Sequence, residues 1–153
     1  MYLERMEGHL MLTIHDELAQ VFAIGELNRL DRLRACAKAN EKGLGQADIA
    51  MRLGVSQPEI HRMLRKIKNF PSLLRETPRV VILQFHAERI SHAQMMETLR
   101  QWPFTFGEDA EPSNPESVLT RGSWDEITDA FHRDLIDVDD YEELCKVVTS
   151  AAE

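Results

Sequence analysis

One stretch of 22 residues limits what this chain can fold into more than any other part of the sequence: QADIAMRLGVSQPEIHRMLRKI, residues 46–67. Its apolar residues can lie on the inner faces of two short helices, with Gly54 between them. Glycine can take the positive φ that a tight turn between helices demands, and Ala50 is small enough for the helices to cross closely. The stretch therefore predicts two helices joined by a turn. The inward-facing residues of this unit are Ile49, Leu53, Val55, Ile60 and Met63.

The second of these helices begins with SQPE, residues 56–59. Ser56 can accept a hydrogen bond from the backbone N–H of Glu59, whose side chain can reach back to the N–H of Ser56. Such a capping box stabilises a helix by ~1 kcal/mol. Pro58 lies in the first turn, where a missing N–H costs no hydrogen bond. The outward positions that follow are basic, so the helix has one apolar and one cationic face. The cationic positions are His61, Arg62, Arg65, Lys66 and Lys68.

The net charge of the chain is −8, but it is unevenly distributed. Residues 28–68 hold 10 Lys and Arg against 4 Asp and Glu, which makes this block +6. Residues 107–153 hold 3 Lys and Arg against 14 Asp and Glu, which makes this tail −11. A basic block of this kind is typical of a surface that binds nucleic acid, and the acidic tail is expected to serve a different purpose.

The remaining N-terminal sequence also predicts helices. Residues 3–23 have apolar residues three or four apart, as an amphipathic helix requires, and Gly25 is expected to interrupt that helix. A second, basic helical run follows and ends in the glycine-containing segment EKGLG. Residues 80–102 predict two short helices, the second of which has Ser91 as its N-cap.

The last third of the chain predicts a linker and a hairpin. Residues 103–122 contain three prolines and two glycines without a periodic apolar pattern, so they are expected to form a linker. Residues 123–150 resume helical spacing, with Ser123 as a cap, and predict an acidic helical hairpin. We therefore expect an all-α fold in which residues 1–102 form a helical domain containing the helix-turn-helix. The two helical pairs match at an offset of 45 residues, at Ile82 and Ile127, Ile90 and Leu135, and Leu99 and Leu144.

The segment QADIAMRLGVSQPEIHRML resembles the DNA-binding helix-turn-helix of bacterial and phage repressors and related regulators. The resemblance covers about 22 residues and is carried by Ala50, Gly54, Val55 and Ile60 together. It implies that the second helix enters the major groove of double-stranded DNA while the first helix bridges the backbone.

The same resemblance implies a role for each exposed residue. Gln57 and Arg62 are the expected base readers, because a Gln amide pairs with adenine and an Arg guanidinium with guanine. Glu59 and His61 would also face the groove, where a carboxylate can accept from cytosine. Phosphate contacts are expected from Gln46, Ser56, Arg65, Lys66 and Lys68.

A second resemblance concerns LRKIKNFPSLL followed by ERISHAQMMETL, which is similar to the stretch after the helix-turn-helix of ParB-type partition proteins. The nucleotide-binding segment characteristic of that family does not precede it. Binding to a partition site is therefore an alternative to the main hypothesis, which is a transcriptional regulator that represses as a homodimer on operator DNA. The first amphipathic helix is the expected dimer interface.

Another alternative belongs to a different functional class. An antitoxin or adaptor would use residues 108–153 to bind a partner protein, while the helix-turn-helix regulates its own expression. The sequence favours neither an enzyme nor a metal or cofactor site, since no catalytic signature appears and no two histidines lie three or four residues apart. Charges interrupt every apolar run near the N-terminus and the two cysteines form no framework, so we expect a cytoplasmic protein without a membrane segment.

Overall fold

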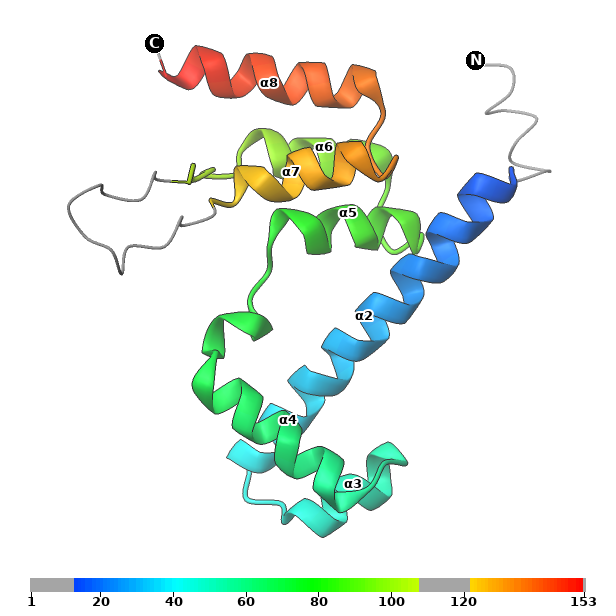
Figure 1. The fold of residues 1–153 in the computed structure, drawn as a ribbon, viewed down its shortest axis with the longest axis vertical. Coiled ribbons are helices and arrows are strands. Elements are labelled where there is room, and N and C mark those ends of the chain that lie inside the picture. The colour runs from blue at the N-terminus through cyan, green and yellow to red at the C-terminus, as the bar shows by residue number, and fades with distance from the viewer. Residues whose placement is uncertain (1–12, 108–121, 153) are drawn as a thin grey trace, which may run out of the picture. The chain divides into compact units, whose positions relative to one another are not determined.

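The computed structural model describes residues 13–107 and 122–152, which form α-helices and one short 3-10 helix without a strand. This confirms the all-α prediction. No helix in these two ranges is both long and apolar enough to cross a membrane. The elements are α2 (Ile14–Glu41), α3 (Gln46–Leu53), α4 (Gln57–Asn69), η1 (Pro71–Leu74), α5 (Pro78–His86), α6 (His92–Arg100), α7 (Trp124–His132) and α8 (Val138–Ala152) (Figure 1).

Helix α2 is continuous over 28 residues, so the predicted break at Gly25 is wrong. The helix starts with a reciprocal cap in which Thr13 and Asp16 each accept from the backbone N–H of the other. A single glycine inside a helix costs only about 1 kcal/mol relative to alanine. Ala23 and Leu27, on either side of Gly25, are fully buried, and the packing of such neighbours offsets that cost.

The chain divides into two compact units, and the division differs from the predicted one. One unit is residues 24–76; the other comprises the described parts of 1–23 and 77–153. The boundary predicted at residue 102 falls inside a single core, because α7 and α8 bury side chains against α5 and α6. That core contains Val81, Ile82, Met95, Met96, Leu99, Ile127, Ala130, Ile136 and Leu144. Most of the predicted linker, residues 108–121, lies outside the described residues.

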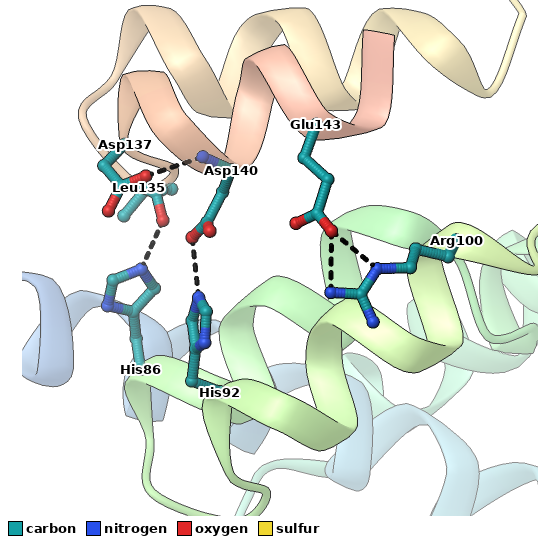
Figure 2. Close-up of polar contacts among 7 residues, drawn as sticks. All are labelled: His86, His92, Arg100, Leu135, Asp137, Asp140 and Glu143. Carbon is teal, nitrogen blue, oxygen red and sulfur yellow. Dashed lines mark hydrogen bonds and ion pairs between the residues drawn. The ribbon is translucent and has the colours of Figure 1, made fainter. Parts of the chain in front are cut away.

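Polar contacts also join the two helical pairs (Figure 2). His86 donates from Nε2 to the backbone oxygen of Leu135 at 2.6 Å, and His92 Nε2 lies 2.8 Å from Asp140 Oδ2. At the other end of α6, the Arg100 guanidinium contacts the carboxylate of Glu143 at 2.9 Å. The acidic hairpin is thus joined to α5 and α6 by polar as well as apolar contacts.

Each helical pair contains a turn of the same kind, and the positions of these turns place the repeat at 46 residues rather than the predicted 45. The segments FHAERIS (85–91) and FHRDLID (131–137) each place a left-handed acidic residue after the first helix, with φ of 62° at Glu88 and 58° at Asp134. Ser91 and Asp137 then accept from backbone N–H groups of the following helix. Apolar spacing alone tolerates a slip of one residue, whereas a left-handed residue and a cap do not.

The caps predicted at Ser91 and Ser123 differ in outcome. Ser91 caps α6 in a complete capping box with Gln94, which confirms the prediction. Ser123 precedes α7, but its side chain makes no capping bond. Its hydroxyl accepts instead from the N–H of Thr105 at 2.9 Å, and its own N–H donates to the Thr105 hydroxyl at 2.9 Å. Ser123 therefore ties the start of α7 to the segment after α6.

Glu126 on α7 provides a test of this packing. Burial raises the pKa of Glu126 above its ordinary value of 4.5, although a hydrogen bond from Thr77 and the charge of Arg79 oppose the shift. The native state then binds the Glu126 proton more tightly than the unfolded chain does, so this group lowers stability as pH rises from 4.5 through the raised pKa. We expect Glu126→Gln to gain stability relative to the wild type over that interval.

Urea unfolding at a series of pH values measures this difference directly. Glu142→Gln, at an exposed position on α8, is the matched control and should follow the wild-type curve. Parallel curves for Glu126→Gln and the wild type would contradict the expected destabilisation by the buried carboxylate.

Candidate nucleic-acid interface

The turn between α3 and α4 has the backbone conformation that the sequence predicts. Gly54 has φ 71° and ψ 32°, in the left-handed region, and its N–H donates to the carbonyl oxygens of Ala50 and Met51. The next N–H, of Val55, donates to the oxygen of Ala50 at 3.0 Å. A Cβ at position 54 would meet nothing within 4 Å, so glycine is required by the dihedral angle rather than by space.

A small core beneath this turn holds three helices together. Cys36 of α2, Ile49 and Ala50 of α3, and Ile60 of α4 are buried in one cluster. Ala50 is 4% exposed, as a small residue at a close helix crossing should be. Burial raises the pKa of the Cys36 thiol, which keeps it protonated and apolar within this cluster. Partly buried side chains that complete it are Ala39, Leu44, Leu53, Val55, Met63 and Leu64.

Helix α4 begins as predicted, with one difference. The Ser56 hydroxyl accepts from the N–H of Glu59 at 3.3 Å, and Pro58 lies in the first turn. Among the hydrogen bonds of the described residues, the return bond from the Ser56 N–H to the Glu59 carboxylate does not occur. The cap therefore supplies one of the two expected bonds, and the side chain of Glu59 does not contribute to it.

All nine predicted DNA-contacting residues lie on α3, on α4 or at the turn between them. Gln46 is the first residue of α3 and is half-buried, as is Glu59 in the first turn of α4. The others are exposed, which leaves their polar groups available to a ligand. These exposed residues are Ser56, Gln57, His61, Arg62, Arg65, Lys66 and Lys68.

The basic residues of this unit fall into two groups. The guanidinium of Arg52 is paired with Asp48 at 3.0 Å, and that of Arg34 with Glu76 at 3.3 Å. In contrast, within the ranges that the structure describes, the cations of α4 have no ion-pair partner. Those cations are Arg62, Arg65, Lys66 and Lys68. Four unpaired cations therefore lie along one exposed helix, although Arg32, Lys38 and Lys42 of the same block also have no ion-pair partner among the described residues.

The positions of these cations along α4 determine which side of the helix they occupy. Ile60, Leu64 and Ile67 recur at the spacing of one helical face and are at least partly buried. Arg62, Arg65 and Lys66 fall on the opposite, exposed face. Gln57, with its amide, lies at the N-terminal end of the same helix. The surface thus offers hydrogen-bond donors near the helix start and cations toward its end, a combination that suits a polyanion with readable base edges.

Some features of this unit are not evident in the sequence. Met51 on α3 is 71% exposed and Phe70 after α4 is 60% exposed, although large apolar side chains are usually buried. Arg34 lies in the basic run of α2, but its guanidinium bonds to the segment after α4. No local signal marks these features, because they depend on which faces of the helices are covered in the folded unit. Among the described residues, no three His, Cys, Asp or Glu side chains gather as they would around a metal ion.

Comparisons with family models, with curated proteins and with solved structures find no match to this chain.

The conformation of Gly54 gives a direct stability test. A side chain at φ 71° costs about 1–2 kcal/mol, so we expect Gly54→Ala to lower the free energy of unfolding by about that amount. Gly25→Ala is the matched control: its Cβ also meets nothing within 4 Å, but Gly25 lies within a helix, so alanine should stabilise by about 0.5–1 kcal/mol. Chemical denaturation measures both, and equal effects of the same sign would refute the assignment of a required left-handed turn.

Proposed function

We propose that this protein binds double-stranded DNA in a sequence-specific manner, as a homodimer that represses transcription. The observation that carries the proposal is the exposed, unpaired cationic face of α4, next to a capped helix start and a glycine turn. In this proposal α4 lies in the major groove and α3 crosses the backbone. Gln57 and Arg62 contact base edges, with Glu59 and His61 beside them. Phosphate contacts come from Gln46, Ser56, Arg65, Lys66 and Lys68.

Two classes of substitution distinguish base reading from phosphate binding. We expect Arg62→Ala to cost about 1–3 kcal/mol of affinity for the selected site and to relax preference at one base pair. Lys68→Ala should weaken binding to all sequences and reduce the salt slope by about 1. Binding-site selection from random duplexes, followed by titration at two salt concentrations, measures both effects. Failure to enrich any motif, or an unchanged motif with Arg62→Ala, would contradict the groove assignment.

The homodimer is supported by the exposed side of α2. Ile14, Leu18 and Val21, spaced by four and three residues, are 61%, 61% and 70% exposed. Apolar residues with this spacing on one helix form a seam that a second helix can cover. A two-fold dimer would then present two copies of α4 to half-sites about 34 Å apart.

Replacement of one seam residue tests the dimer without DNA. We expect Leu18→Glu to convert a dimer to a monomer in sedimentation velocity experiments, because the carboxylate cannot be buried unpaired. Ala35→Glu introduces the same charge at another exposed position of α2 and should leave the dimer intact. A wild-type chain that sediments as a monomer at tens of micromolar would exclude this interface.

An antitoxin or adaptor remains the second candidate, and the charge of the tail favours it. Residues 107–153 carry −11, and Asp134, Asp137, Asp139 and Glu142 are exposed on α7–α8 or its turn. Such a surface suits a basic partner protein. A partner that co-purifies with the wild type and is lost when these four residues are neutralised would support the second candidate. A ParB-like role would instead require binding to a partition site.

A further inference from the structure

Arg34 makes two long-range contacts within the unit of residues 24–76. Its Nε donates to the backbone oxygen of Leu74 at 3.0 Å, and its Nη2 donates to Glu76 Oε1 at 3.3 Å. These bonds join positions 40 and 42 residues apart in the chain. The Arg34 side chain is 34% exposed and that of Glu76 is 47% exposed, so the bond to Leu74 is partly shielded from water whereas the contact with Glu76 is open to it.

The contacted segment follows α4 directly. Helix α4 ends at Asn69, Phe70 closes it through a bond to the oxygen of Lys66, and η1 (Pro71–Leu74) comes next. The N-terminal half of α4 is held against α2 by the buried cluster around Ile60. The C-terminal end, where Lys66 and Lys68 lie, is followed by exposed residues, with Phe70 60% and Leu73 38% exposed. Apolar packing alone therefore fixes this end poorly.

We infer that Arg34 is a positioning residue for DNA binding: it fixes the C-terminal end of α4 against α2 and does not itself contact DNA. The inference rests on the proposed function. A planar guanidinium suits this role because it can donate to a carbonyl and a carboxylate at once, whereas a lysine ammonium cannot reproduce that fork. Arg34 holds η1, and η1 limits how far the last turn of α4 can move. Lys66 and Lys68 then meet phosphates in a fixed register.

Charge-matched variants separate positioning from direct contact. Arg34→Lys keeps the charge but loses the fork, so we expect affinity for the selected duplex to fall about fivefold or more. Arg32→Lys, at an exposed position on the same helix, is the control and should bind as the wild type does. Glu76→Ala and Glu76→Gln both remove one negative charge, but only Gln keeps an acceptor for Nη2. We expect Glu76→Gln to retain affinity and Glu76→Ala to lose it.

The salt dependence supplies a readout that a direct phosphate contact would change. Arg34→Gln should weaken binding with an unchanged slope of log affinity against log salt, because Lys66 and Lys68 still reach the phosphates in the complex and only the cost of ordering the end of α4 increases. A slope reduced by about 1 would show a phosphate contact and overturn the inference. Equal affinities of Glu76→Ala and Glu76→Gln would overturn it as well.

Hydrogen exchange tests the contacts of Arg34 with Leu74 and Glu76 without DNA. Failure of the inference can therefore be distinguished from failure of the proposed function. The N–H groups of Leu73 and Arg75 bond to the oxygens of Phe70 and Ser72 within the held segment. We expect Arg34→Lys to accelerate their exchange while Arg32→Lys does not. Unchanged exchange in Arg34→Lys overturns the inference even if the wild type binds DNA. Absence of duplex binding by the wild type overturns the proposed function, and with it the role of Arg34 in binding.

Discussion

The left-handed conformation of Gly54 is the constraint on which the candidate site depends. It ends α3, lets two N–H groups bond back to α3, and starts α4 three residues later with Ser56 as its cap. Because the turn is so short, Ala50 and Ile60 meet at the helix crossing and bury Cys36 of α2 beneath them. Packing on the inner face then leaves the outer face of α4 to polar and basic residues. Backbone geometry at one residue thus decides which side chains are available to a ligand.

The electrostatic arrangement follows from the same packing. Arg34 and Arg52 lie within the basic block but are neutralised by Glu76 and Asp48. The cations of α4 have no such partners among the described residues, so four unpaired positive charges lie along one exposed helix. The opposite charge resides in the other unit, where Arg100 and the two histidines of Figure 2 bind part of the acidic hairpin to α5 and α6. Counting charges along the chain identifies both blocks but not the internal pairs.

The local part of this structure could be predicted from the sequence. A glycine that must be left-handed, a serine before a first-turn proline, and apolar residues at helical spacing are signals that neighbouring residues determine. These signals predict the turn at Gly54, the bond that the Ser56 side chain accepts, and the cap at Ser91. The same signals place all nine predicted contact residues on or beside α3 and α4, although their role in binding remains a prediction.

Two of the incorrect expectations, the break at Gly25 and the separate C-terminal hairpin, have tertiary packing as their cause. Gly25 does not break α2, since buried neighbours offset the cost of one glycine. The hairpin of α7 and α8 joins the core of α5 and α6 because Ile127 and Leu144 are buried in that core. Residues 103–122 contain no sequence signal that predicts this contact. The repeat register of 46 is set by the left-handed residues Glu88 and Asp134, which are not glycines and so give no compositional signal. From the sequence alone, Arg34 cannot be distinguished from the other surface cations, because its bond to Leu74 depends on the tertiary structure.

In the proposed function, the outer face of α4 is the DNA-binding surface of this protein. This assignment is tested most directly by two-dimensional ¹H–¹⁵N NMR spectra of the full chain, titrated with the duplex obtained by site selection. We expect the largest amide shifts to cluster in residues 56–68, with a smaller set at the start of α3. Shifts concentrated in α7 and α8, or no shifts at duplex concentrations above those that saturate binding, would contradict it.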